Sequence, residues 1–217
     1  SARHVSRIAF AGTQPSGSSR SPFMRQLENI HLIGMPGSGK STVGRGLAQR
    51  LGLGFVDADE EVVSRTGVPI ATIFELEGEE GFRLREAQVL SDLCARNGLV
   101  IATGGGAILR EDNRSLLRAR GVVVYLHATL EHLRQRTHRD TRRPLLQAGN
   151  PEAMLAALLE KREPLYRELA DVVVETGRQS VGKLAQEIIA ALARANLWAG
   201  DAGSENRPSD DHLDNRA

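Results

Sequence analysis

One glycine-rich run has the residue types and spacing to bind the phosphates of a nucleoside triphosphate. Residues 34–42 read GMPGSGKST and match the pattern G-x-x-x-x-G-K-[ST] at every fixed position. Glycines let successive backbone N–H groups turn toward the phosphates, and in this pattern Lys40 reaches the β- and γ-phosphates while Ser41 offers its hydroxyl to Mg²⁺. A surface turn of small residues is the alternative. However, the apolar run Asn29–Ile33 precedes the loop and the helical pattern Val43–Leu51 follows it, as a phosphate-binding loop requires.

Two carboxylates follow the second apolar run of the chain. The sequence reads Asp57-Ala58-Asp59, and residues two apart at the end of an extended strand project to the same side. One carboxylate can help to hold hydrated Mg²⁺, and the other can accept a proton or hydrogen bond from an acceptor hydroxyl, as phosphoryl transfer requires. The alternative is a helix cap, because Asp59 precedes Glu60, Glu61 and an apolar helix face. Capping and function are compatible.

A second glycine cluster and two arginines could bind a polar acceptor. The cluster Thr103–Ala107 follows the apolar run Leu99–Ala102, and its glycines would let a ligand approach backbone N–H groups, although a plain flexible turn has the same composition. Arg83 and Glu86 are three residues apart in a helical pattern, so the carboxylate could orient the guanidinium toward a ligand. Surface pairing is the alternative there, and simple covering of a helix surface is the alternative for Arg162.

The elements that must position these residues alternate between short apolar runs and longer helical stretches. Near-continuous hydrophobicity at 122–126 predicts a strand covered on both faces, as in a parallel sheet between helices. We therefore expect an α/β three-layer sandwich with a five-stranded parallel sheet, with ligands at the carboxyl ends of the strands. The polar stretch from Thr137 to Asn150 is a candidate mobile lid. The expected strands are Ile30–Ile33, Gly54–Val56, Leu99–Ala102, Val122–Leu126 and Val172–Val174, and the expected helices are Lys40–Leu51, Glu60–Thr66, Ile70–Glu77, Glu80–Ala95, Glu111–Arg118, Leu130–Arg136, Pro151–Leu169 and Val181–Ala195.

Length and composition indicate one folded domain with two tails. A chain of 217 residues with 41% hydrophobic content can bury one substantial core, which we place at 27–196, between a disordered N-terminal extension at 1–26 and a disordered acidic tail at 197–217. A net charge of +1 gives no general attraction to nucleic acid, and no apolar run is long enough to span a membrane. The single Cys94 excludes an internal disulfide and is expected to be a small core residue in a reducing cytoplasm.

The order of the motifs along the chain is more specific than any one of them. GMPGSGKST, DAD, FRLRE, TGGGA, RRPLL and KREPLY, in this sequence and at these separations, resemble the shikimate kinase family over about residues 29–192. The resemblance implies a fold of the P-loop NTPase type, related to nucleoside monophosphate kinases. It also implies ATP-dependent phosphorylation of the 3-hydroxyl of shikimate, giving shikimate 3-phosphate and ADP in the chorismate route to aromatic amino acids. The expected partners are shikimate and ATP, Mg²⁺ is the expected cofactor, and a monomer is the default.

The resemblance also assigns residues to the acceptor side of the site. Arg83 of FRLRE and Arg162 of KREPLY would clamp the carboxylate of shikimate, with Glu86 steadying Arg83. Asp59 would bind the hydroxyls and act as the base. The backbone that faces the substrate would come from Gly104, Gly105 and Gly106.

On the nucleotide side, the resemblance places Asp57 with Ser41 on the Mg²⁺ shell and Lys40 on phosphate. Arg143 of RRPLL would swing in with the lid toward the transferring phosphoryl group. Family members commonly place Arg and Pro against the adenine in the segment after the last strand, and here Glu175–Val181 contains Arg178 but no Pro. Arg136, at the base of the lid, should lie near the adenine. The full set of expected nucleotide contacts is Gly37, Ser38, Gly39, Lys40, Ser41, Thr42, Arg136, Arg143 and Gln179.

Two other functions fit parts of the pattern. Another small-metabolite kinase of the same fold, such as a gluconate kinase or a nucleoside monophosphate kinase, would share the phosphate loop. A monophosphate kinase needs a base pocket and several arginines facing phosphate, whereas TGGGA and DAD together suit a small polyol acid better. A catalytically silent relative could instead bind ATP or shikimate as a regulatory module. Loss of Lys40, Ser41, Asp57 or Asp59 would indicate such a module, and all four are present.

Overall fold

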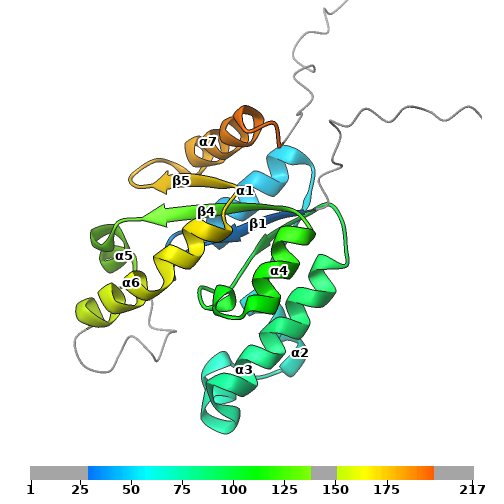
Figure 1. The fold of residues 1–217 in the computed structure, drawn as a ribbon, viewed down its shortest axis with the longest axis vertical. Helices are drawn as coiled ribbons and strands as arrows, with labels where there is room; N and C mark the ends of the chain where they lie inside the picture. Colours follow the sequence, from blue (N-terminus) through cyan, green and yellow to red (C-terminus); the bar gives the residue numbers. More distant parts are fainter. Residues whose placement is uncertain (1–28, 138–150, 198–217) are drawn as a thin grey trace, which may run out of the picture.

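The described part of the protein contains one parallel β-sheet with helices on both faces (Figure 1). A computed structural model describes residues 29–137 and 151–197. The sheet has five strands in the order β2-β3-β1-β4-β5, and every neighbouring pair is parallel. This arrangement confirms the expected α/β sandwich. The strands are β1 (Asn29–Ile33), β2 (Gly54–Asp57), β3 (Leu99–Ala102), β4 (Val122–Ala128) and β5 (Val172–Thr176).

Alternating residues of the central strands supply two separate hydrophobic cores. In β4, Val122, Val124 and Leu126 face one core, whereas Val123 and Tyr125 face the other. The first core is completed by α1 and α7, and the second mainly by α2, α3, α4 and α6. Burial on both faces explains the near-continuous hydrophobicity of this strand. The helices are α1 (Lys40–Leu51), α2 (Ala58–Thr66), α3 (Ile70–Cys94), α4 (Glu111–Ala119), α5 (Leu130–Thr137), α6 (Pro151–Leu169) and α7 (Val181–Arg194), and η1 (Ala107–Leu109) is a 3₁₀ turn.

Most expected elements appear within two residues of their predicted bounds, and the differences have local causes. The two helices expected at Ile70–Glu77 and Glu80–Ala95 form one element, α3, which is bent at Gly78 with φ 71° and ψ −176°. The turn η1 was not predicted, because its residues continue the glycine cluster. The edge strand β5 is covered on one face only, so Val173 is 41% exposed.

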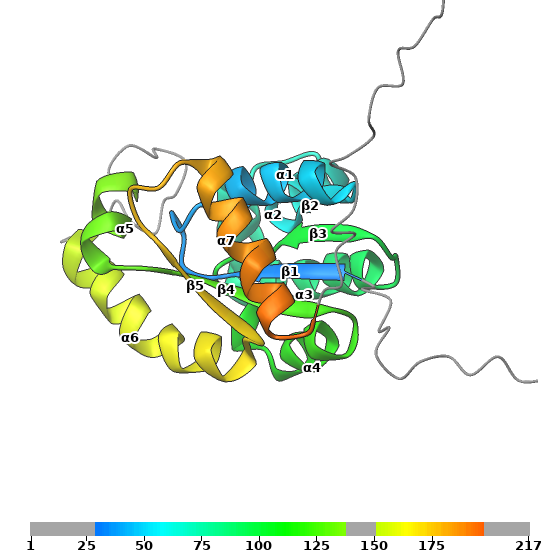
Figure 2. The same ribbon diagram turned by 90° about the horizontal axis from the view of Figure 1, so that it is seen from above.

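The carboxyl ends of all five strands lie at one edge of the sheet, as parallel pairing requires (Figure 2). At that edge the phosphate loop follows β1 and the glycine cluster follows β3. Asp57 is the last residue of β2, and Asp59 follows it in α2. The pairing of Asp57 with Ala102 and of Leu32 with Ala102 brings these three segments together. The candidate lid apart from Thr137, which ends α5, both expected tails apart from Leu197, and Arg143 lie outside the described residues, so those expectations stay predictions.

Two smaller expectations concern burial and membranes. Cys94 is 1% exposed within the α3 core, and burial raises the pKa of its thiol to about 11, so it is a core residue as expected. Among the helices in the described ranges, none is both long and apolar enough to cross a bilayer.

Candidate active site

The phosphate loop leads directly into α1. Gly39 precedes the helix in a left-handed conformation (φ 96°), and no side chain among the described residues caps the first turn, so the backbone N–H groups there are available to an anion. The Lys40 ammonium is buried and donates hydrogen bonds to the carbonyl oxygens of Gly34 (2.8 Å) and Met35 (2.9 Å). The loop and the start of α1 therefore combine a positive charge with uncapped donors, which suits phosphate.

Asp57 joins the start of α1 to the start of α2. Its Oδ2 accepts a hydrogen bond from the Ser41 hydroxyl, and its Oδ1 accepts from the backbone N–H groups of Asp59 (2.9 Å) and Glu60 (3.3 Å). The N-cap of α2 is thus Asp57, so the alternative interpretation, in which Asp59 caps this helix, does not hold. A carboxylate beside a hydroxyl is a pair of hard oxygen donors, and this chemistry fits Mg²⁺.

Asp59 reaches the acceptor side by a different route from the one expected. It lies in the first turn of α2, so the two aspartates do not project from one extended strand. Its half-buried carboxylate lies against Gly104, where a Cβ would come within 2.7 Å of Asp59 Oδ1 and would also overlap Glu86 Oε1. Asp59 and Glu86 therefore approach the same point of the glycine cluster from α2 and α3.

Glu86 is a fully buried carboxyl between charged neighbours. Its Oε2 accepts from Arg83 Nη1 at 2.8 Å, whereas its Oε1 has no hydrogen-bond partner among the described residues. The pKa of Glu86 is raised to about 7: burial is the largest cause, the charge of Asp59 adds to the rise, and Arg83 and Arg162 oppose it. This carboxyl is thus partly protonated near neutral pH, as a group in a desolvated acidic pair should be.

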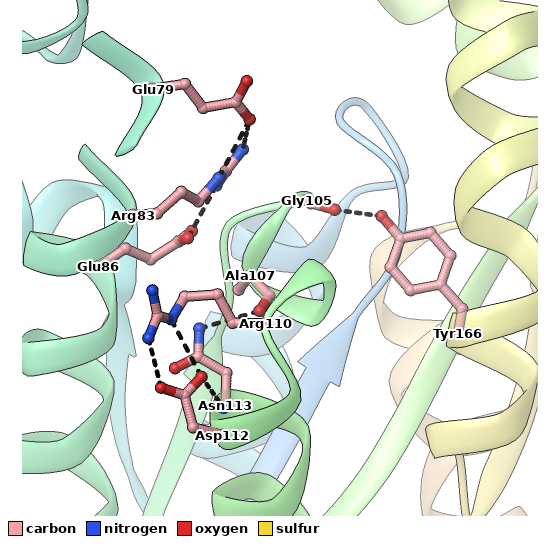
Figure 3. A network of polar contacts seen from close by, with 9 residues as sticks. All are labelled: Glu79, Arg83, Glu86, Gly105, Ala107, Arg110, Asp112, Asn113 and Tyr166. Atoms are coloured by element: carbon pink, nitrogen blue, oxygen red, sulfur yellow. Dashed lines mark hydrogen bonds and ion pairs between the residues drawn. The ribbon is translucent and has the colours of Figure 1, made fainter. Parts of the chain in front are cut away.

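Arg83 is the best-oriented cation of the site. Burial disfavours its charge, but Glu86 and Glu79 together raise the pKa of its guanidinium. Glu79 Oε1 contacts Arg83 Nη2 at 3.2 Å from the solvent side (Figure 3). The guanidinium lies over Gly106, where any Cβ would overlap it. The hydrogen bond from Arg83 to Glu86 therefore supports the interpretation that Glu86 orients Arg83.

The three glycines of the cluster each face a different neighbour. A Cβ would meet the Asp59 and Glu86 carboxylates at Gly104, the Pro36 ring of the phosphate loop at 2.7 Å at Gly105, and the Arg83 guanidinium at Gly106. All three glycines are buried. Close packing of acceptor-side groups, rather than a plain flexible turn, accounts for the glycine triplet.

Arg162 approaches the same region from α6. It is 7% exposed, and its Nε has no partner within the part of the chain that the structure describes. Its charge acts on both Glu86 and Tyr166, which places two guanidinium groups around one carboxyl. Sequence reasoning missed Tyr166, Pro36 and Glu79 as members of this group; Tyr166 was inside the KREPLY motif, but the motif gave it no role.

The expected adenine-side residues gather beside the phosphate loop. Arg136 Nη2 donates to the carbonyl of Gly177 at 2.6 Å, and its Nη1 lies 3.4 Å from the carbonyl oxygens of Gly37 and Ser38. Gln179 Oε1 accepts from the Gly177 N–H at 2.6 Å, so its side chain closes the turn after β5. Thr42 is exposed in the first turn of α1.

This fold and this loop define the class of the protein. In the part of the chain that the structure describes, a five-stranded parallel sheet has a phosphate loop after its central strand and is flanked by seven α-helices, which is the architecture of a P-loop kinase. A family model described as shikimate kinase matches residues 36–193. Shikimate kinase from Shewanella amazonensis is 53% identical over 169 residues, covering 78% of this chain and 99% of that protein. The chain belongs to the shikimate kinase family.

Solved structures agree with this assignment. The shikimate kinase of Acinetobacter baumannii in complex with shikimate has a TM-score of 0.77 and 50% identity, over 80% of this chain and 97% of that one. A gluconokinase from Sinorhizobium meliloti 1021 has a TM-score of 0.54 and 26% identity, over 79% and 94% of the two chains. The fold is shared with the rival kinase, but the similarity in sequence and structure is much greater to the shikimate kinases.

Proposed function

We propose that this protein transfers the γ-phosphoryl group of ATP to the 3-hydroxyl of shikimate, giving shikimate 3-phosphate and ADP. The observation that carries the proposal is the group formed by Arg83, Arg162 and Asp59 around the glycine cluster, next to the phosphate loop. Shikimate has one carboxylate and three hydroxyls, and this group offers two guanidinium cations and a carboxylate acceptor. Membership of the shikimate kinase family supports the same reaction.

The acceptor side would orient shikimate before any bond changes. Arg83 and Arg162 would bind its carboxylate, with Glu86 holding Arg83 in place. Gly104, Gly105 and Gly106 would leave room for the ring beside the backbone. Asp59 would accept the proton of the 3-hydroxyl as the oxygen bonds to the γ-phosphorus and the bond from that phosphorus to the bridging oxygen of ADP breaks.

The nucleotide side would neutralise the charge of the transferring group. Lys40 would exchange its contacts with the loop carbonyls for the β- and γ-phosphates. Ser41 and Asp57 would hold Mg²⁺, which supplies charge neutralisation to the phosphates when bound. Arg143 would approach with the lid, Arg136 would lie near the adenine, and the remaining expected nucleotide contacts would be Gly37, Ser38, Gly39, Thr42 and Gln179.

The proposed function also implies a location, an oligomeric state and a set of binding partners. We infer a cytoplasmic monomer that binds two small molecules and neither nucleic acid nor a membrane. The near-neutral formal charge of +1 supports the absence of a nucleic-acid partner. Sedimentation of the purified protein measures its oligomeric state, and a stable dimer would contradict this part.

The experiment that tests the function is ADP release with Mg-ATP and a panel of acceptors. Shikimate, gluconate, nucleoside monophosphates and no acceptor are compared under identical conditions, with Lys40→Ala as the control for contaminating kinases. We expect release only with shikimate, and none from the variant. Turnover with gluconate instead would overturn the acceptor assignment, and ATP binding without turnover would favour a regulatory module.

A further inference from the structure

Tyr166 borders the glycine cluster, although it has no role in the chemistry above. Its side chain is completely buried on α6. Its hydroxyl donates a hydrogen bond to the carbonyl oxygen of Gly105 at 2.5 Å (Figure 3). The two residues are 61 positions apart, so this contact ties α6 to the glycine cluster after β3.

Gly105 is held from two sides. The Pro36 ring lies so close that a Cβ on Gly105 would come within 2.7 Å of its Cδ. The Tyr166 hydroxyl approaches the carbonyl of the same residue and also lies 3.9 Å from Met35 Sδ. One hydroxyl is thus in contact with both the glycine cluster and the start of the phosphate loop.

The charge of Arg162, also on α6, acts on the same hydroxyl. It precedes Tyr166 by four residues, and residues at that spacing lie on one face of a helix. Burial raises the pKa of Tyr166, and the charge of Arg162 and a hydrogen bond from its side chain oppose the rise. The hydroxyl that donates to Gly105 therefore also lies beside the charge of Arg162, one turn earlier on the same helix.

We propose that Tyr166 is a positioning residue for the acceptor: its hydroxyl sets the Arg162 guanidinium and the Gly105 peptide at a fixed spacing across the shikimate site. Because it acts through two acceptor-side groups, it should affect acceptor binding much more than ATP binding. The inference rests on the proposed function, since it names the ligand that Arg162 and the glycine cluster hold.

The chain contains a matched control for this hydroxyl. The rings of Tyr125 on β4 and Tyr166 stack with centroids 4.9 Å apart, and both are buried in the same core. The Tyr125 hydroxyl, however, is buried without a hydrogen-bond partner among the described residues. Tyr→Phe at either position keeps the ring stack, but only Tyr166→Phe removes a hydroxyl that contacts the site.

The test compares Michaelis constants of the wild type, Tyr166→Phe and Tyr125→Phe for both substrates, with thermal unfolding measured alongside. Loss of a buried hydrogen bond that leaves its partners unsatisfied should raise the KM for shikimate about tenfold in Tyr166→Phe, with the KM for ATP within about twofold. Tyr125→Phe should leave both constants within about twofold. Equal increases for both substrates, or a shikimate KM no higher than in Tyr125→Phe, would overturn the inference.

A second comparison tests the coupling to Arg162. If Tyr166 acts through this guanidinium, Tyr166→Phe should raise the shikimate KM less in an Arg162→Lys background than in the wild type. Fully multiplicative effects would contradict a shared role. The wild-type rate with shikimate is the separate check on the reaction: no turnover there would overturn the proposed function and this inference together, whereas normal wild-type turnover with an unaffected Tyr166→Phe would overturn the inference alone.

Discussion

Asp57 and Asp59 are two residues apart in the sequence but occupy different parts of the site. Asp57 caps α2 and accepts a hydrogen bond from the Ser41 hydroxyl, and the proposed function places it on the nucleotide side. Asp59 lies two residues further along, in the first turn of α2, and its carboxylate lies against Gly104 and near Glu86. This division is what a kinase needs from a carboxylate pair, because metal binding and proton acceptance must not compete for one group.

We expect Asp59→Asn to reduce phosphoryl transfer to shikimate by at least about a hundredfold, because an amide cannot accept the proton of the hydroxyl. The affinity for ATP should change by less than about twofold, since Asp59 is placed on the acceptor side. Coupled ADP-release kinetics and nucleotide titration measure the two effects. Asp92→Asn, at an exposed ion pair with Arg65, is the matched control and should retain full activity.

Glu86 should make stability depend on pH in a predictable direction. Its pKa is about 7 in the folded protein against 4.5 ordinarily, so unfolding between these values releases a proton. The contribution of Glu86 to the free energy of unfolding is therefore fully present at low pH. It is lost as pH rises through about 7, and the total loss is about 3 kcal/mol. Because glutamine does not titrate, the stability of Glu86→Gln relative to the wild type should rise by about 3 kcal/mol between about pH 4 and pH 8.

Urea unfolding at several pH values measures this difference. Glu79→Gln is the control, because Glu79 also contacts Arg83 but is 61% exposed. Its stability relative to the wild type should stay constant to within about 0.5 kcal/mol over the same range. A Glu86→Gln variant that behaves in the same way would show that folding does not raise the pKa of the buried carboxyl.

At the scale of elements, the bend at Gly78 divides α3 into two segments that make different contacts. The part after Gly78 carries Arg83 and Glu86 to the site, and the part before it packs Phe74 against Phe82 at a ring separation of 4.9 Å. The φ of 71° with ψ of −176° is a backbone conformation open almost only to glycine. If α3 ran straight through Gly78, the segment before it would carry Phe74 away from Phe82.

Gly78→Ala should therefore destabilise the protein by about 2 kcal/mol, although no atom of the described residues lies within 4 Å of the new Cβ. The cause would be backbone strain alone. Gly182→Ala in α7 is the control: its φ is ordinary and its Cβ would meet only the flexible end of Arg50, so stability should be unchanged or higher by about 0.5 kcal/mol. Chemical denaturation of both variants makes the comparison, and an equal, small effect at both sites would rule out strain at Gly78.

For the whole molecule, Cys94 provides a natural probe of opening. It is the single cysteine of the chain, is 1% exposed, and has a pKa raised by burial to about 11. A thiol reagent should therefore modify it only when the α3 core opens, and the rate should rise with urea in parallel with the loss of helical circular dichroism.

The control places a thiol one turn away on the exposed side of the same helix. Ser91→Cys combined with Cys94→Ala should react at the rate of a free thiol without denaturant. Saturating shikimate should slow the labelling of Cys94 and leave that of the control unchanged, because a ligand of the folded state reduces opening. Rapid labelling of Cys94 in native buffer would show that α3 opens locally.

The sequence alone determined the kind of fold and the identity of most candidate groups. Periodicity and the glycine–lysine loop are local signals, because burial of one helix face or of both faces of a strand is written in neighbouring residues. For this reason α1 and α6 have their predicted bounds, and the other elements differ by at most two residues, apart from the union of two helices across Gly78. Arg83 and Glu86 were paired from their spacing in one helix.

Only the tertiary structure decided how the segments meet. The hydrogen bond between Tyr166 and Gly105 joins residues 61 positions apart, and no local pattern encodes it. The cap of α2 falls on Asp57 and not Asp59 because the strand ends there against Ser41 of another element. Such contacts depend on the sheet order and on the combined packing of several elements, and that information is distributed over the whole chain and not contained in any one segment.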